Sequence, residues 1–406
     1  MAGKAEIPRR NLVIGLAAGI VTAAGISSLE HFNSKRDFSL TSQEAIRKVQ
    51  LLSRYKKKYP ITSNPQLIGT AVNIPFTPYD EDKSLVRKVV KNMQTMGSKI
   101  ARVYIPDNFE PSIGMFNKQY IDELLHFIQQ AEELSGGNTT FIVSLLDTYR
   151  LLHSHKFNPI YGSATLNHPY LEGAVHNDEI AFQQQAFFTA EDKIEAFVNR
   201  SNFIINSLYP VAEHIGAWEL ANEPEITFET DNKVAALSDW YGKIVPRIRD
   251  IDPNTPIISG IKNPMDIYAE QLYSLGLDHN SAHIYGGNFS SEQEGLSSYI
   301  DFIQQGVALP PVLLLESSYP KIMYGFNMPR FFHDAQLARS ISDLILQNIL
   351  VDEDNEEVGL PVPCYGIWQL ETNAKSMDGF HFDPDHYPRT THAMKAIQEL
   401  LTEQPT

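Results

Sequence analysis

The stretch Gly216-Ala-Trp-Glu-Leu-Ala-Asn-Glu-Pro-Glu225 has the form of a short buried strand that ends in functional side chains. Apolar residues dominate its first half, and Asn222 and Glu223 close it. Pro224 then ends the strand, because proline has no N–H group to donate to a neighbouring strand. The stretch therefore places a carboxyl group at the tip of a strand, where an ionisable side chain is costly unless it is paired or used.

Short apolar runs of the same kind recur along the whole chain and alternate with longer segments of helical period. We expect eight strands, at Leu67–Ile74, Lys99–Ile105, Thr140–Leu146, Gly216–Leu220, Ile257–Gly260, Ser281–Tyr285, Val312–Glu316 and Tyr365–Leu370. Helices are predicted at Lys83–Met96, Gln119–Leu134, Asp192–Leu208 and Ala335–Leu350, with Thr189 and Asp192 forming the cap of the third. Strands without polar alternation are buried on both faces, so the chain is predicted to be an α/β protein with a single (β/α)8 barrel.

The composition is that of a globular protein with an acidic surface. Among 406 residues there are 33 Lys and Arg against 49 Asp and Glu, which gives a net charge of −16. This balance repels phosphate backbones, so we expect a neutral substrate and no nucleic acid. The single cysteine, Cys364, leaves no disulfide within the chain, and we expect a monomer held together by its core.

A second acid ends a second apolar strand. The run Pro311-Val-Leu-Leu-Leu-Glu316 carries Glu316 at the same kind of position as Glu223. In a barrel of parallel strands both tips lie at one mouth. Hydrolysis of a glycosidic bond needs one carboxyl to protonate the leaving oxygen and one carboxylate as base or nucleophile. Glu223 and Glu316 are therefore the predicted catalytic pair.

The motif Trp218-Glu-Leu-Ala-Asn-Glu-Pro224 resembles the fourth-strand signature of clan A glycoside hydrolases, above all family 5 and its β-mannanases. The similarity extends over roughly residues 65–400 in the right strand order. The matching positions are Arg102 on the second strand, His283 and Tyr285 on the sixth, Glu316 on the seventh and Trp368 on the eighth.

The resemblance implies a role for each of these residues. Glu316 would be the nucleophile of a retaining enzyme and Glu223 its acid/base, with the carboxyls about 5–5.5 Å apart. Asn222 would bond the sugar 2-hydroxyl, Arg102 and Tyr285 would keep Glu316 ionised, and Trp368 would stack on the sugar before the cleavage point. His283 belongs to the same substrate-binding set.

Some positions depart from the mannanase pattern. Glu225 stands where an arginine commonly follows Asn-Glu-Pro, and Ser317-Ser318 follow Glu316 in place of an aromatic residue or glycine. The third strand ends in Asp147. These differences leave the substrate open between mannan and glucan.

The remaining acidic and histidine groups have simpler interpretations. Glu219 reads as a packed or paired structural group, and His381, Asp383, Asp385 and His386 fit no metal-binding spacing, so we expect neither metal nor cofactor. The long connection from Asp147 to about Phe188, rich in aromatic and histidine residues, follows the third strand. It is either a wall of a sugar cleft or an ordinary surface excursion.

The N-terminus has the pattern of an export signal. Lys4 and Arg9-Arg10 precede an apolar run from Leu12 to Ile26, which is shorter than the about 20 residues that span a bilayer. The paired arginines resemble a twin-arginine signal. We predict an export segment at 1–36 and the catalytic barrel at 37–406; the alternative is an uncleaved N-terminal membrane anchor, since no clear cleavage site follows.

Together with the family resemblance, the residues predict an exported, retaining endo-β-1,4-glycanase that acts on a neutral polysaccharide or oligosaccharide. Mannan endo-1,4-β-mannosidase is the first hypothesis. An endo-β-1,4-glucanase is the nearest alternative, because mannose and glucose differ only at the 2-hydroxyl. A non-catalytic carbohydrate-binding protein on the same barrel is the third, although two acids at strand tips favour an enzyme.

Overall fold

The computed structural model describes one compact unit within residues 51–406. The described residues are 64–74, 83–105, 109–148, 170, 177–224, 233–265, 274–285, 295–296, 298–299, 302, 309–318, 322–323, 326–327, 334, 337–338, 350–351, 357–359, 364–367, 384–385 and 387–402. The predicted leader at 1–36 and its boundary with the barrel therefore lie outside the described residues. So does most of the helix expected at Ala335–Leu350.

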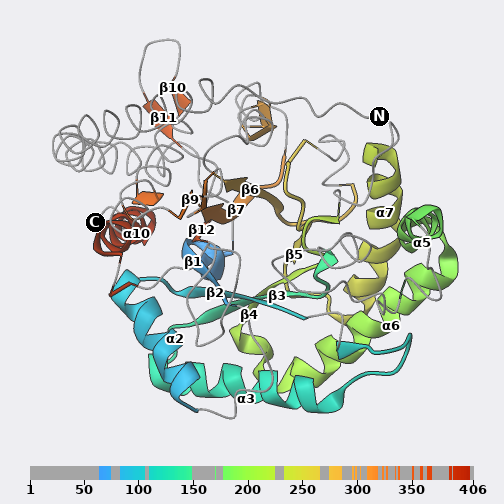
Figure 1. Cartoon of the computed structure of the whole chain (residues 1–406), viewed down its shortest axis with the longest axis horizontal. Helices are drawn as coiled ribbons and strands as arrows, with labels where there is room; N and C mark the ends of the chain where they lie inside the picture. The colour runs from blue at the N-terminus through green and yellow to red at the C-terminus, as the bar shows by residue number, and fades with distance from the viewer. Residues whose placement is uncertain are drawn as a thin grey trace, which may run out of the picture. The chain divides into compact units, whose positions relative to one another are not determined.

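Eight parallel strands form the barrel, in the order β5-β4-β3-β2-β1-β12-β7-β6 (Figure 1). Their bounds are β1 Gly69–Ile74, β2 Ile100–Tyr104, β3 Thr140–Ser144, β4 Ile215–Glu219, β5 Ile257–Ile258, β6 Asn280–Tyr285, β7 Val312–Ser318 and β12 Cys364–Ile367. A parallel bridge between Ile258 and His279 joins the two ends of this order, beside β5 and β6. All eight predicted strands are present, and the predicted (β/α)8 barrel is confirmed.

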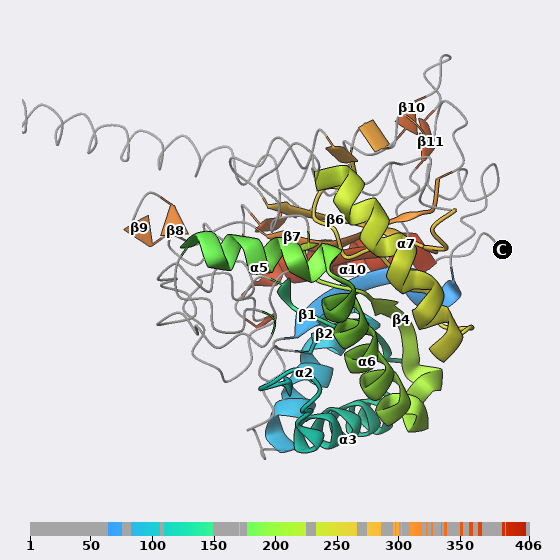
Figure 2. The same ribbon diagram turned by 90° about the vertical axis from the view of Figure 1, so that its right-hand side faces the viewer.

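Helices and two small hairpins surround the strands. The helices are η1 Pro65–Leu67, α2 Lys83–Met96, α3 Lys118–Ser135, α5 Asn177–Thr189, α6 Glu191–Leu208, η4 Tyr209–His214, α7 Lys233–Ile251 and α10 Pro388–Thr402. The hairpins pair β8 Ile322–Met323 with β9 Phe326–Asn327, and β10 Leu350–Val351 with β11 Glu357–Gly359. Helices α2, α3, α6 and α7 follow one another around the outside of the strands, as Figure 2 shows from the side. Within the described part of the chain, no helix is both long and apolar enough to cross a membrane.

Small and branched side chains fill the barrel below the strand tips. Strand residues that point inward form one buried cluster, with Leu67 at its base: Ala71, Ile100, Ile142, Ala217, Ile258, Leu313, Leu315 and Cys364. Because strand side chains alternate between the two faces, the next inward positions toward the tips are Asn73, Arg102, Glu219 and His283. The same alternation that builds the apolar core therefore delivers polar groups to one end of the barrel.

Two details differ from the sequence-based expectation. The last part of the long connection after β3 is helix α5, and only Tyr170 is described between it and Thr148. Helix α6 begins after Ala190 without a side-chain cap, so the predicted cap at Thr189 is wrong. The Thr189 hydroxyl instead donates to the carbonyl oxygen of Gln185 at 3.0 Å, which uses it in the last turn of α5.

A buried ion pair outside the barrel interior joins α6 to the loop after β2. Arg200 donates to the carboxylate of Glu110 at 3.2 Å and to the carbonyl oxygens of Leu145 and Ile105. Tyr170 donates to the same carboxylate at 3.0 Å. One arginine thus fixes the ends of β2 and β3 and one point of the long connection.

Candidate active site

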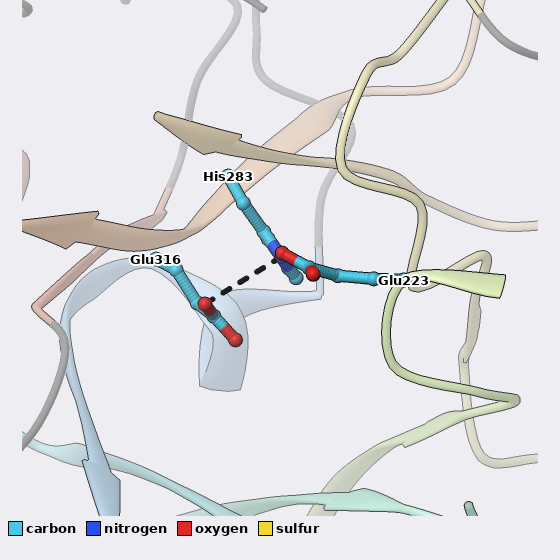
Figure 3. Close-up of side chains that lie close together, drawn as sticks. All are labelled: Glu223, His283 and Glu316. Atoms are coloured by element: carbon cyan, nitrogen blue, oxygen red, sulfur yellow. Dashed lines mark hydrogen bonds and ion pairs between the residues drawn. The ribbon is translucent and has the colours of Figure 1, made fainter. Parts of the chain in front are cut away.

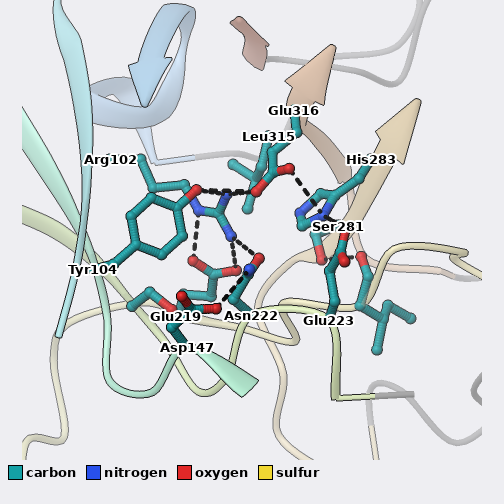
Figure 4. Close-up of polar contacts among 12 residues, drawn as sticks. Arg102, Tyr104, Asp147, Glu219, Asn222, Glu223, Ser281, His283, Leu315 and Glu316 are labelled. Carbon is teal, nitrogen blue, oxygen red and sulfur yellow. Dashed lines mark hydrogen bonds and ion pairs between the residues drawn. The ribbon is translucent and has the colours of Figure 1, made fainter. Parts of the chain in front are cut away.

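A buried polar cluster lies at the carboxyl ends of strands β2, β4, β6 and β7. It contains both predicted catalytic acids, Glu223 and Glu316, and three of the predicted substrate-binding residues, Arg102, Asn222 and His283 (Figure 4). All five residues are at most 6% exposed. The barrel therefore brings these predicted residues together from positions up to 214 residues apart in sequence.

A β-bulge turns Glu316 toward the barrel interior. Strand β7 pairs Leu314 with Ala282 and Glu316 with His283, so Leu315 is an extra residue on one side of the ladder. Leu313 and Leu315 both contribute to the inward core, and strict alternation would send Glu316 outward. The bulge removes that constraint, as bulges near active sites often do.

Glu316 is held by a guanidinium and a phenol. Arg102 donates to its Oε1 atom through Nη1, and the Tyr104 hydroxyl donates to the same oxygen at 3.0 Å. Burial raises the pKa of Tyr104 well above its usual value, so it faces Glu316 as a neutral hydrogen-bond donor. The second oxygen, Oε2, lies 3.6 Å from Nδ1 of His283. One oxygen of Glu316 is thus held by Arg102 and Tyr104, and the other lies near His283.

Glu223 has a strained backbone, and its side chain is the second carboxyl that contacts His283. It is the one described non-glycine residue with positive φ, 51°, and its N–H donates to the carbonyl oxygen of Gly260 at 2.8 Å. Its Oε1 atom lies 2.8 Å from Nδ1 of His283. Backbone strain of this kind persists only where the surroundings enforce it, and it occurs often at active sites.

His283 is the bridge between the two carboxyls (Figure 3). One ligand atom from each of Glu223, His283 and Glu316 lies within 4.8 Å of the other two. Nε2 of His283 is buried with no hydrogen-bond partner among the described residues. A neutral ring with its proton on Nδ1 leaves only a lone pair unpaired at Nε2, so Nδ1 is the donor toward the carboxyls.

These three residues are also the one group in the described part of the chain that is close enough to share a metal ion. A metal ion bound to Nδ1 of His283 would move the ring proton to Nε2. The buried N–H formed there would have no acceptor among the described residues. The neighbouring charge of Arg102 also opposes a cation. The arrangement fits proton transfer between hydrogen-bonded groups better than metal binding.

Arg102 organises the rest of the cluster through all its donors. Nε donates to Oε2 of Glu219 at 2.7 Å, and Nη2 donates to the other oxygen of Glu219 and to Oδ1 of Asn222 at 2.8 Å. Nη1 bonds Asn73, Tyr104 and Glu316. Burial by itself lowers the pKa of Arg102, but the negative charges of Glu219 and Glu316 outweigh it and raise the pKa well above its usual value.

Asn222 is fixed from both ends of its amide. Its oxygen accepts from Arg102, and its Nδ2 donates to Asp147 at 3.2 Å. A parallel bridge also joins the backbones of Asp147 and Asn222 just beyond β3 and β4. One N–H of the Asn222 amide is therefore directed by Asp147, and the other remains to contact a ligand.

The sequence missed part of this cluster. The prediction that Glu219 is paired is confirmed, but Tyr104, Asn73 and Asp147 were not assigned to the site. Tyr104 follows Arg102 by two residues on one strand, so strand periodicity could have found it. The side chain of Tyr285 and all of Trp368 lie outside the described residues, and their predicted roles stay predictions.

Comparison with known proteins gives the same fold and the same group of relatives. No family model matches the chain. It is 21% identical to mannan endo-1,4-β-mannosidase 5 of Arabidopsis thaliana over 366 residues, which cover 80% of this chain and 78% of that protein.

Solved structures of mannanases share the barrel. The endo-β-1,4-mannanase of Thermotoga petrophila matches with a TM-score of 0.60 and 18% identity, over 84% of this chain and 78% of that one. The endo-1,4-β-mannanase of Rhizomucor miehei matches with a TM-score of 0.55 and 17% identity, over 82% and 95%. The chain therefore has the (β/α)8 fold of these mannanases, and its predicted resemblance to β-mannanases is confirmed.

Proposed function

We propose that the protein is a retaining β-glycoside hydrolase whose substrate is a β-1,4-linked mannan, that is, a mannan endo-1,4-β-mannosidase. The observation that carries the proposal is the meeting of Glu223 and Glu316 around His283, with their nearest ligand atoms within 4.8 Å. Retaining glycosidases hold their two carboxyls about 5–5.5 Å apart, whereas inverting ones need about 6.5–9.5 Å for a water between them. The short separation supports direct attack by one carboxylate.

In the first step, an oxygen of Glu316 forms a bond to the anomeric carbon while the bond to the leaving oxygen breaks. Glu223 gives its proton to that leaving oxygen. In the second step, Glu223 takes a proton from water, whose oxygen attacks the anomeric carbon and releases Glu316. His283 donates to one oxygen of Glu223 at 2.8 Å and leaves the other free to carry the transferred proton.

The free N–H of Asn222 supports a contact with the sugar. In a glycoside bound between the two acids, the 2-hydroxyl is the group that such an amide would bond, and this contact strengthens as charge develops in the transition state. Mannose and glucose differ at this hydroxyl, so we propose that Asn222, held by its partner Asp147, takes part in distinguishing the two sugars. The similarity to mannanases supports mannan as the first substrate to test.

Sugar release from mannan, glucomannan, carboxymethylcellulose and xylan tests the proposal. We expect release from mannan by the full chain, with a loss of about 10²- to 10⁴-fold in Glu223→Gln and at least as much in Glu316→Gln. Glu110→Gln, which alters a buried acid outside the site, is the matched control and should keep its activity per folded molecule.

The remaining outcomes decide between the alternatives. Release only from carboxymethylcellulose would make the protein a glucanase, and sugar binding without release from any of the four would make it a binding protein. Proton NMR of the first product distinguishes the mechanism: a retaining enzyme gives the β-anomer before it equilibrates. An initial α-anomer would contradict the role proposed for Glu316.

We also propose that the protein is exported under the direction of its first 36 residues. The basic pair Arg9-Arg10 before the apolar run from Leu12 to Ile26 supports this. Replacing both arginines by lysine, with the protein then assayed in cell fractions, tests the twin-arginine route. Unchanged export of that variant would point to another route or to an anchor.

A further inference from the structure

Arg102 lies between two buried carboxylates and donates more hydrogen bonds to one than to the other. Glu219 accepts two hydrogen bonds from it, from Nε and from Nη2, and Glu316 accepts one, from Nη1 (Figure 4). All three side chains are at most 2% exposed. One positive charge therefore has to balance two negative charges in a place that water does not screen.

The unequal sharing matters because of what a nucleophile requires. A carboxylate that holds a guanidinium in a two-bond pair is stabilised as an ion, and its oxygens attack a carbon less readily. Glu219 takes this place, whereas Arg102 gives Glu316 only one hydrogen bond, at Oε1. That oxygen also accepts from the neutral Tyr104, and Oε2 lies 3.6 Å from Nδ1 of His283. Glu219 thus draws the guanidinium charge away from Glu316.

No other described positive charge faces Glu316 to make up the difference. Tyr104 of β2 is a neutral donor, Asn73 of β1 is uncharged, and His283 of β6 stands as a neutral ring. Cys364 of β12 is a neutral thiol, because burial raises its pKa to about 12. Glu223, beyond β4, adds a like charge whenever it is ionised.

We propose that Glu219 is a positioning residue that sets the charge on the proposed nucleophile by holding Arg102 as its own counter-ion. This inference rests on the proposed function, since it assigns to Glu219 the control of Glu316 in that reaction. Glu219 touches no substrate; it acts through Arg102. Removing its charge would let Arg102 pair fully with Glu316 and would make Glu316 a weaker base and a weaker nucleophile.

The dependence of kcat/KM on pH separates this role from a structural one. In Glu219→Gln the charge is lost while the size is kept. We expect the acidic limb of the profile to move to lower pH by about 1 unit, and kcat to fall about 10-fold or more. If Glu219 had only a structural role, Glu219→Gln would lower the fraction of active protein and leave the acidic limb of the kcat/KM profile at the same pH.

Two further variants keep the test decisive. Glu219→Asp keeps the charge but moves it away from Arg102, so we expect a smaller shift in the same direction; if Glu219→Gln does not fold, this variant decides. Glu110→Gln makes the same change in the buried Glu110–Arg200 pair and should leave the limb unmoved. A folded Glu219 variant with low kcat and an unshifted limb would overturn the inference.

A readout without turnover separates this inference from the proposed function. Carbon NMR of the protein labelled at its glutamate carboxyls follows the titration of the site directly. Glu316→Gln identifies the Glu316 signal, and we expect that signal to titrate at lower pH in Glu219→Gln than in the original protein. If the protein cleaves no glycoside but the signal shifts, the charge control stands and the reaction is wrong. If glycosides are cleaved but the Glu316 signal does not shift, the proposed reaction stands and the control of Glu316 by Glu219 is wrong.

Discussion

The carbonyl oxygen of Leu315 lies where a side chain on Gly366 would have to be: a β-carbon on Gly366 would be 2.0 Å from that oxygen. Leu315 is the extra residue of the β7 bulge, and Asn73 donates to the same carbonyl oxygen at 2.8 Å. The bulge that turns Glu316 inward therefore depends on an empty space on the neighbouring strand β12. The position of the proposed nucleophile therefore depends on a glycine of the neighbouring strand.

Gly366→Ala should displace Leu315 and with it Glu316. We expect kcat to fall about 10²-fold or more, since a misplacement of about 1 Å can cost that much, and the melting temperature to drop as well. Gly242→Ala is the matched control, because Gly242 lies in helix α7 with its nearest neighbour at 3.4 Å, where alanine should be neutral or stabilising. A Gly366→Ala protein with normal kcat would show that the bulge does not need this space.

Gly260 has the corresponding role for Glu223. Its φ is +80°, and a β-carbon would lie 1.8 Å from the carbonyl oxygen of Ala221. Gly260→Ala should therefore break the turn that carries Glu223 and abolish both the activity and much of the stability. Gly136→Ala has a similar φ of +68° with open space around it, so it should cost only about 1 kcal/mol. Thermal unfolding of the two variants separates the cost of a steric clash, present only in Gly260→Ala, from the cost of positive φ, present in both. Equal losses of stability in the two variants would contradict the tight fit at Gly260.

The fold could be predicted from the sequence more completely than the site. Doubly buried strands such as Val312–Glu316 have no polar alternation, so eight of them between helices already defined the barrel. The same lack of alternation hid the bulge, because three leucines give no sign of which one is extra. The acids at strand tips were found because a carboxyl there is costly. Asp147 and Asn73 were missed because their role exists only after β1, β3 and β4 lie side by side.

The Glu110–Arg200 pair should be a large determinant of stability. Glu110→Ala leaves the fully buried Arg200 without its carboxylate, and we expect the free energy of unfolding to fall by about 3–5 kcal/mol. Glu191→Ala removes a partner of Arg247 at the surface and should cost less than about 1 kcal/mol. Urea unfolding of the two variants compares a buried with an exposed pair. Similar losses would mean that burial of Arg200 contributes little.

His279 should make the barrel less stable in acid. Burial lowers the pKa of His279 from 6.5 to about 4, although the charge of Asp278 opposes this shift. The unfolded chain therefore binds a proton more readily than the folded one between these values. The contribution of neutral His279 to the free energy of unfolding is fully present above about pH 6.5 and declines as the pH falls toward 4. At that pH the protein has lost about 3 kcal/mol through this one group.

The variant His279→Leu isolates this effect, because leucine does not titrate. The free energy of unfolding of the original protein should lose up to about 1.4 kcal/mol more per pH unit than that of the variant in this range. Ile258 and His279 form the bridge that joins the two ends of the sheet, so acid should act at this junction first. Hydrogen exchange at Ser259, whose N–H donates to the carbonyl oxygen of His279 at 3.2 Å, reports the opening there. Parallel pH dependences of the two proteins would show that His279 takes up its proton without strain, which its burial argues against.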